Sequence, residues 1–99
     1  NGPALYAEAC RMYDQFLEIV PSSHVGSFNC GLAYISRARL SAMACGESAE
    51  SDQFYLSAKT RFEQCIKLRP SDKKAQRYVD ECAKALSSKE ESASATSVE

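Results

Sequence analysis

Five cysteines and one histidine are the residues of this 99-residue chain that could support nucleophilic or metal chemistry. The cysteines stand singly, at positions 10, 30, 45, 65 and 82, and the histidine is His24. A zinc site needs a Cys-x-x-Cys pair or several histidines, and a cysteine nucleophile needs a histidine base beside it. Neither pattern is present in the sequence, which therefore predicts a protein that is not an enzyme and that holds no metal or other cofactor.

The cysteines are odd in number, and each lies within an apolar or helical pattern, which indicates reduced core thiols and not a disulfide framework. Thiols of this kind persist in a reducing compartment, so the sequence predicts a cytoplasmic location. The chain has no secretory signal and no apolar run near the ~20 residues that a membrane span requires. Because it opens with "NGP" and no methionine, we expect it to be a piece of a longer protein.

The composition is 44% hydrophobic and 25% charged, which is typical of one small globular domain. The formal net charge of -1 conceals a basic set in the second half of the chain, formed by Lys59, Arg61, Lys67, Arg69, Lys73, Lys74 and Arg77. This set either attracts an acidic partner or is the solvated face of two helices. A near-neutral domain lacks the strong positive field that nucleic acid requires, so we expect no nucleic-acid partner.

Apolar residues recur at helical three- and four-residue spacings and predict four helices, over about residues 3–20, 24–45, 52–69 and 72–86. The stripe that we expect the first helix to bury consists of Leu5, Ala9, Met12, Tyr13, Phe16 and Val20. The helix boundaries are marked by Pro21, by Ser22 or Ser23 as the second N-cap, by Gly46, and by Ser51 or Asp52 as the third N-cap. The predicted fold is an all-α domain over residues 1–86, followed by a disordered Ser/Glu-rich tail over 87–99.

The first and third predicted helices each end just before a proline, Pro21 and Pro70 respectively. The residues five, eight and twelve positions before Pro21 are Phe16, Tyr13 and Ala9. The residues at the same distances before Pro70 are Cys65, Phe62 and Ala58. This alanine, aromatic, proline spacing resembles the second helix of a tetratricopeptide repeat (TPR).

The stretch "SFNCGLAY" resembles the first-helix signature of the same family at Gly31 and Tyr34, with Cys30 in place of its leucine and Ser27 in place of its tryptophan. The resemblance implies four antiparallel helices in an array of helical hairpins, an α-α superhelix. A glycine inside a helix is unfavourable by roughly 1 kcal/mol relative to alanine. We expect the missing side chain of Gly31 to let the neighbouring antiparallel helix approach closely, near Ala58.

Pro21 and Pro70 are 49 residues apart, against a family repeat of about 34, so 15 extra residues lie between Tyr34 and Ala58. Helical spacing continues through much of this insertion. We therefore predict that both helices of the central hairpin are about two turns longer than usual and join near residues 46–51. The alternative is a disordered insertion over residues 36–53, where polar residues are common.

The first helices of successive repeats in this family line a concave groove that binds a partner peptide or helix. The resemblance places the following partner-binding candidates there: Val25, Phe28, Asn29, Leu32, Lys74, Arg77 and Tyr78. Leu32 and the nearby Ile35 could instead belong to the core. The predicted mechanism is recognition of a protein segment by apolar anchors with polar or charged contacts around them.

Three functions remain open at this stage. The first is a TPR scaffold or adaptor that binds a partner peptide. The second is a co-chaperone-like or import-receptor-like domain that recognises acidic C-terminal or amphipathic targeting segments, because Asn29 and Lys74 match two of the five clamp positions in chaperone-binding members. At the position of the clamp arginine stands Tyr78, with Arg77 one residue away. The third is structural self-assembly through the N-terminal helix or the long hairpin.

Overall fold

The computed structural model describes the backbone of residues 2–46 and 48–98, and the side chains of residues 4–87 apart from 45 and 47. It contains four helices: α1 (Gly2–Ile19), α2 (His24–Cys45), α3 (Ala49–Leu68) and α4 (Lys73–Val98). No strand occurs within the described backbone. The all-α prediction is therefore confirmed, with the four helices at close to the expected positions.

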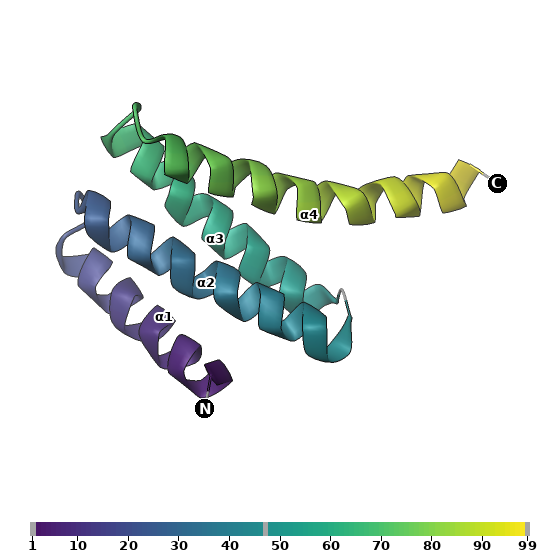
Figure 1. Cartoon of the computed structure of the whole chain (residues 1–99), viewed down its shortest axis with the longest axis horizontal. Coiled ribbons are helices and arrows are strands. Elements are labelled where there is room, and N and C mark those ends of the chain that lie inside the picture. Colours follow the sequence, from purple (N-terminus) through teal and green to yellow (C-terminus); the bar gives the residue numbers. More distant parts are fainter. Residues whose placement is uncertain (1, 47, 99) are drawn as a thin grey trace.

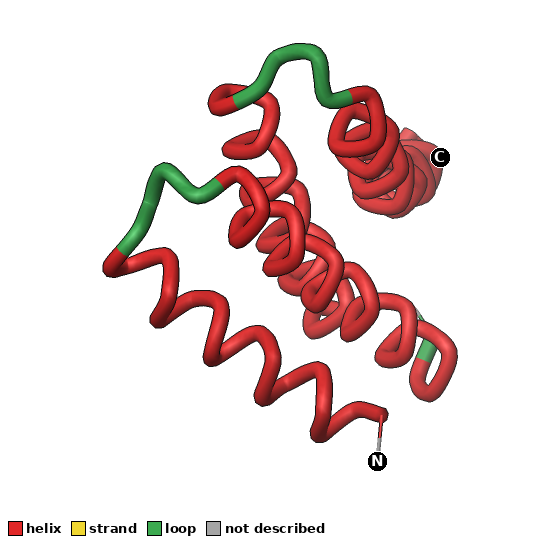
Figure 2. Tube along the Cα trace, turned by 60° about the vertical axis from the view of Figure 1, so that its left-hand side comes forward, coloured by secondary structure: helices red, strands yellow, loops and turns green. Residues whose placement is uncertain are grey.

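Each helix runs antiparallel to the one before it, and the four form a flat array with principal extents of 48 × 33 × 19 Å (Figure 1). The tube view shows α1 at one edge of the array and α4 at the other, with α2 and α3 between them (Figure 2). Consequently α2 packs against α1 on one flank and against α3 on the other. The edge helices α1 and α4 each keep one side without a neighbouring helix of the described chain.

The ends of α2 follow the predicted capping residues. Ser23 is the N-cap, and its Oγ accepts a hydrogen bond from the backbone N–H of Gly26 at 2.9 Å. Gly46 ends the helix with a φ of 73°, a left-handed conformation that glycine adopts without steric penalty. The predictions for Ser23 and Gly46 are therefore confirmed.

The start of α3 differs from the prediction. Its N-cap is Ser48 and not Ser51 or Asp52, so the helix begins at Ala49. The reason is a reciprocal capping box, in which the backbone N–H of Ser51 donates to Ser48 Oγ at 3.3 Å and that of Ser48 donates to Ser51 Oγ at 2.9 Å. The connection between α2 and α3 is therefore shorter than the predicted 46–51 segment.

The central hairpin is helical along nearly all of the segment over which the sequence left helix and disorder open. α2 has 22 residues and α3 has 20, and they continue to a connection of only three residues, 46–48. Residue 47 lies outside the described part of the chain. The structure therefore agrees with the long helical hairpin and not with a disordered insertion over residues 36–53.

The last helix is longer than the sequence predicts. A disordered tail was expected over 87–99, whereas α4 continues to Val98. The segment after Leu86 contains no glycine or proline that would end the helix, although its serines and charged residues offer little to bury. Residue 99 and the side chains of 88–98 lie outside the described part of the structure.

The core lies where α2, α3 and α4 meet. Its buried cluster consists of Ile35, Ala58, Phe62, Cys65, Ala75 and Cys82. The ring of Phe62 is at the centre, stacked on Tyr78 at 4.8 Å between centroids and edge-on to Phe28 at 5.5 Å. A Cβ on Gly31 would lie 2.8 Å from this ring, so Phe62, and not Ala58 as expected, is the residue that requires glycine at position 31.

The face of α1 that packs on α2 is not the one that the sequence predicts. Cys10 and Leu17 are the buried apolar residues of α1, at 2% and 3% exposure. Leu5, Met12 and Phe16 of the predicted stripe are 67%, 58% and 43% exposed. The helix carries two apolar faces about a third of a turn apart, and α2 covers the one with Cys10 and Leu17.

A polar junction holds α1 to both helices of the hairpin. The carboxylate of Asp14 accepts hydrogen bonds from the hydroxyl of Tyr34, from the thiol of Cys30 at 3.4 Å and from Nη2 of Arg61 at 2.8 Å. Burial by itself would raise the pKa of Asp14, but these hydrogen bonds outweigh it and hold the pKa below its usual value. Asp14 is therefore an ionised link between α1, α2 and α3.

Candidate partner-binding grooves

The first candidate site is a groove of about 460 Å³ between α2 and α4. We call it the α2–α4 groove, and its lining residues are Phe28, Arg39, Lys74, Arg77, Tyr78 and Glu81. They come from the two helices that follow the prolines, and the contact of His24 with Asp72 shows that the starts of α2 and α4 lie close together. Its lining therefore combines two aromatic side chains with four charged ones.

The aromatic part of the α2–α4 groove rests directly on the core. Phe28 and Tyr78 meet edge to face, with centroids 5.9 Å apart and ring planes at 68°. Both are half-buried, and both contact the buried ring of Phe62 beneath them. Because their inner sides are held by the core, the two rings offer a preorganised apolar surface to a ligand.

The charged part contains paired and unpaired groups. Arg39 forms an ion pair with Glu81. Lys74 and Arg77 are exposed, and their side chains form no ion pair within the part of the chain whose side chains are described. The groove therefore presents, beside its aromatic surface, two cations that have no ion-pair partner among the described side chains.

The entrance of the groove, where α2 and α4 begin, is held by a histidine–carboxylate contact. Nε2 of His24 lies 2.6 Å from Oδ2 of Asp72, while Oδ1 of Asp72 accepts the backbone N–H of Ala75 at 3.0 Å. The bond from Ala75 and the contact with His24 hold the pKa of Asp72 below its usual value. Asp72 therefore stays ionised, and its carboxylate lines the entrance together with Lys73 and Lys74.

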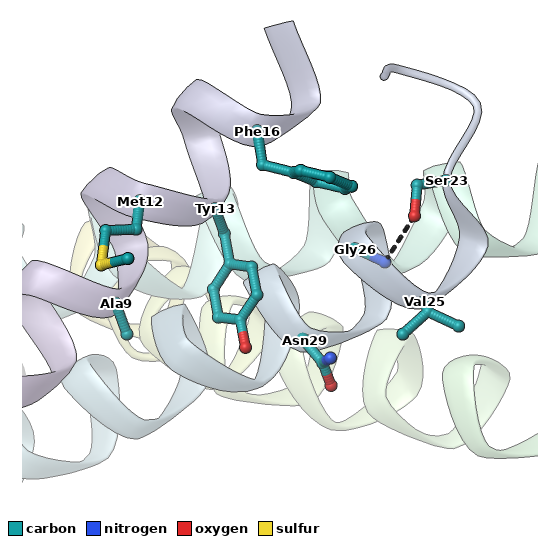
Figure 3. Close-up of a pocket in the computed structure, with 8 residues that line it drawn as sticks. All are labelled: Ala9, Met12, Tyr13, Phe16, Ser23, Val25, Gly26 and Asn29. Atoms are coloured by element: carbon teal, nitrogen blue, oxygen red, sulfur yellow. Dashed lines mark hydrogen bonds between the residues drawn. The ribbon is translucent and has the colours of Figure 1, made fainter. Parts of the chain in front are cut away.

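A second groove, of about 450 Å³, lies between α1 and α2 (Figure 3). We call it the α1–α2 groove, and its lining residues are Ala9, Met12, Tyr13, Phe16, Ser23, Val25, Gly26 and Asn29. None of these residues is charged. In the close-up, Phe16 projects from α1 toward Gly26 and Tyr13 projects toward Asn29, whereas Met12 lies further along α1 beside Ala9. This groove is therefore suited to apolar ligands.

The predicted partner-binding residues divide between these two grooves. Phe28, Lys74, Arg77 and Tyr78 line the α2–α4 groove together. Asn29 lines the α1–α2 groove, and Val25 borders it too while also lying near Phe28 and Lys74 at the entrance of the other groove. Leu32 is partly buried and packs against the core cluster.

Two groups of residues in the grooves were not anticipated. Arg39 and Glu81 are 42 positions apart, and no local pattern indicates that they pair. Met12 and Phe16 were assigned to the core, but they line an open groove. A period of 3.6 residues identifies the apolar face of a helix, but it does not tell whether another helix covers that face.

The four cysteines whose side chains the structure describes are in environments that suppress nucleophilic chemistry, while the side chain of Cys45 lies outside the described part. Cys10, Cys30, Cys65 and Cys82 are unpaired and buried, as the sequence predicts for core thiols. Burial raises the pKa of Cys30 and Cys82 to about 12 and that of Cys65 to about 11, so these thiols are protonated at neutral pH. Among the described side chains, no group of three or more His, Cys, Asp or Glu residues is arranged to bind a metal ion.

Within the described residues, none of the helices has the length and apolar character needed to cross a membrane. Comparisons with protein-family models, with curated proteins and with solved structures found no match.

Proposed function

We propose that this chain is a TPR-type protein-interaction module and that its α2–α4 groove binds an acidic peptide segment that carries an apolar anchor. The observation that carries this proposal is the position of Lys74 and Arg77, two unpaired cations, beside the aromatic pair Phe28 and Tyr78. In this proposal the groove binds the peptide and catalyses no reaction on it.

We expect the peptide to carry an apolar side chain because the groove contains the aromatic pair Phe28 and Tyr78. An aliphatic or aromatic side chain of the peptide packs against Phe28 and Tyr78 and removes apolar surface from water on both partners. The core holds both rings in place, so little conformational freedom is lost when the peptide binds.

The acidic character of the peptide follows from the positive charges of the groove and its entrance. Lys73 and Arg69 lie at the entrance, next to Lys74, and extend the positive surface. The planar guanidinium of Arg77 can hold a carboxylate through two parallel hydrogen bonds, whereas Lys74 acts as a point charge. A carboxylate within a few residues of the apolar anchor would therefore meet a charge-assisted contact in this groove.

Membership of the TPR family is supported by the repeated spacing before Pro21 and Pro70 and by the antiparallel order of the helices. The co-chaperone alternative has weaker support. Asn29 and Lys74, the two residues that match the carboxylate clamp, line different grooves.

The experiment is a selection from a displayed library of disordered peptide segments with the full chain as bait. We expect the enriched peptides to combine Asp or Glu with a nearby aromatic or aliphatic residue. The double variant Lys74→Ala/Arg77→Ala should bind them at least about tenfold more weakly, and binding by the wild type should weaken between ~50 and ~500 mM salt.

The matched control is Lys59→Ala/Lys67→Ala on α3, which removes the same number of positive charges from residues that do not line the groove. It should bind the selected peptides as the wild type does. Enrichment of neutral or basic peptides, or equal losses in the two double variants, would exclude the proposed site.

A further inference from the structure

The exposed face of α1 carries a row of apolar residues. We call this row the α1 stripe, and it consists of Leu5, Ala9, Met12, Phe16 and Ile19. These residues recur at spacings of four and three, so they lie along one side of the helix. Met12 and Ile19 are 58% and 81% exposed. A contiguous exposed apolar surface is typical of a site where another element packs.

The two helices that end before a proline correspond to each other residue by residue. Five, eight and twelve residues before these prolines, α1 has Phe16, Tyr13 and Ala9, and α3 has Cys65, Phe62 and Ala58. In addition, α1 packs on α2, the helix that follows it, as α3 packs on α4. The three residues of each set therefore lie on equivalent faces of the two helices.

On α3 this face is covered by the helix that precedes it in the chain, which is α2. Ala58, Phe62 and Cys65 are 0% exposed. A Cβ on Gly31 of α2 would lie 2.8 Å from the ring of Phe62. The thiol of Cys65 donates to the backbone oxygen of His24, also on α2, at 3.7 Å. On α1 the equivalent face has no helix over it within the described chain.

We propose that the α1 stripe is covered by a further helix, which directly precedes α1 in this protein and packs on it antiparallel, as α2 packs on α3. The connection between α2 and α3 is only three residues long, 46–48. A helix that lies on α1 in the equivalent way ends close to the start of α1 and is joined to it by a similarly short connection. The flat array of Figure 1 then continues by one helix beyond α1.

A covalent connection explains how a narrow contact on the α1 stripe can be stable. The stripe extends over about 21 Å of α1, and a contact one helix wide is smaller than the roughly 1,200–2,000 Å² of a typical stable interface. A separate partner would therefore bind weakly by apolar contacts alone. A helix joined to α1 by a few residues has an effective concentration in the millimolar range, so a smaller area is sufficient.

The residues of the α1–α2 groove determine the chemistry of the covering helix. No charged residue lines this groove. A charged side chain placed over it would lose its hydration without gaining a partner, so the covering face is apolar. Tyr13 corresponds to Phe62, and α2 places Gly31 against the ring of Phe62. We therefore expect glycine or another small residue where the covering helix crosses Tyr13.

Thiol labelling of two cysteine variants tests whether the stripe is covered. Each variant is prepared in the 99-residue chain and in a chain that also contains about 30 residues of the protein's own preceding sequence, enough for one helix and its connection. Met12→Cys lies in the α1 stripe, and Met43→Cys is the matched control at an 82% exposed methionine of α2. The wild type of each length gives the background from the native cysteines.

Both thiols should react quickly in the 99-residue chain. In the extended chain, the thiol of Met12→Cys should react at least about tenfold more slowly, because it becomes accessible only when the covering helix opens. The thiol of Met43→Cys should react at the same rate in both chains. Equal labelling of Met12→Cys in the two chains would exclude a covering helix at this place.

A charge in the stripe gives a second readout. Met12→Glu should lower the urea midpoint of the extended chain by about 0.5–1 M, because the covering helix would bury a carboxylate without a partner. The same substitution should leave the midpoint of the 99-residue chain nearly unchanged, since Met12 is exposed there. Equal effects on the two chains would contradict the proposal.

The result is separable from that of the peptide selection. All residues that line the α2–α4 groove lie on α2 and α4, so Lys74→Ala/Arg77→Ala should leave the labelling of Met12→Cys unchanged in both chains. If the protection of Met12→Cys in the extended chain increased with protein concentration, the stripe would be covered by a second copy, and the preceding helix would be excluded as its occupant.

Discussion

Gly31 of α2 packs directly against the ring of Phe62 on α3. A Cβ at position 31 would lie only 2.8 Å from the nearest ring carbons. Phe62 is 0% exposed and is held between Phe28 and Tyr78. The ring has no free space into which it could move. The closest approach of the two hairpin helices therefore depends on the absence of a side chain at this one position.

Gly26, five residues earlier in α2, is a natural comparison. A Cβ there would lie 2.7 Å from the ring of Phe16, but Phe16 is 43% exposed and can rotate toward solvent. Replacement of a helical glycine by alanine gains up to about 1 kcal/mol of helix propensity at either position. Only at position 31 must a buried ring be displaced.

We therefore expect Gly31→Ala to lower the free energy of unfolding by about 1–3 kcal/mol, because overpacking outweighs the gain in propensity. Gly26→Ala should be neutral within about 0.5 kcal/mol or slightly stabilising. Urea unfolding followed by circular dichroism measures both. Equal effects of the two substitutions would show that the packing of Phe62 does not decide the residue at position 31.

Two fully buried serines offer a second test. Ser27 and Ser51 are both 0% exposed, but Ser27 Oγ has no hydrogen-bond partner among the described residues, whereas Ser51 takes part in the capping box with Ser48. Ser27→Ala removes a polar group that gains nothing from burial and should raise the free energy of unfolding by up to about 1 kcal/mol. Ser51→Ala should lower it by about 0.5–2 kcal/mol.

The same thermal or urea denaturation series measures both serine variants. The prediction concerns the sign of the difference, since the two substitutions delete the same atom from equally buried positions. A loss of stability in Ser27→Ala comparable to that in Ser51→Ala would mean that the hydroxyl of Ser27 is hydrogen-bonded in solution.

Local signals in the sequence were sufficient for the helices. Apolar periodicity and capping residues predicted four helices, and Ser23 and Gly46 act as expected. The start of α3 was missed because Ser48 and Ser51 cap it reciprocally, and a Ser-x-x-Ser pair is a weaker signal than a serine followed by glutamate. The predicted start of α3 was therefore wrong because the sequence signal for its N-cap was weak.

The packing of α1 could not be predicted in the same way. The helix has one apolar face with Cys10 and Leu17 and another with Met12 and Phe16. The sequence pattern alone predicts that the face with the larger residues is the buried one. α2 covers the first face because Asp14, on the same side of the helix, is bound by Tyr34 and Arg61. This choice depends on partners 20 and 47 residues away, which helical periodicity does not report.

The candidate site was partly predictable for a related reason. Phe28 and Tyr78 come together because α2 and α4 both begin after a proline turn, and the spacing of the prolines is visible in the sequence. Asn29 follows Phe28 directly, so it lies about 100° further around the helix and faces the α1–α2 groove. Helical geometry alone could have separated these two residues.

The junction at Asp14 leads to a prediction about pH. Hydrogen bonds from Tyr34, Cys30 and Arg61 hold the pKa of Asp14 below its usual value of 3.8 in the folded chain, although burial opposes them. A carboxylate of this kind stabilises the folded state fully above its unfolded pKa, and the stabilisation is lost as the pH falls through that value toward the lower folded one. The contribution of Asp14 should therefore be present at neutral pH and should begin to decrease as the pH falls below about 4.

Asp14→Asn replaces the carboxylate by an amide of the same shape that carries no charge and whose nitrogen cannot accept a hydrogen bond. We expect it to lower the free energy of unfolding by about 1–2 kcal/mol at pH 7, at the low end for charged hydrogen bonds because Asp14 is partly exposed. The difference from wild type should be smaller at about pH 3 than at pH 7. Asp72, whose pKa is also lowered, is present in both chains and cancels from this difference.

Glu8→Gln is the matched control, because it removes a carboxylate from the same helix that pairs only with Arg11 on the surface. Solvent screens this pair, so the substitution should have no measurable effect at either pH. Urea unfolding of the three chains at about pH 7 and about pH 3 measures the two differences. If the difference between wild type and Asp14→Asn were the same at both pH values, the ionised carboxylate would not be what joins α1 to Tyr34 of α2 and Arg61 of α3.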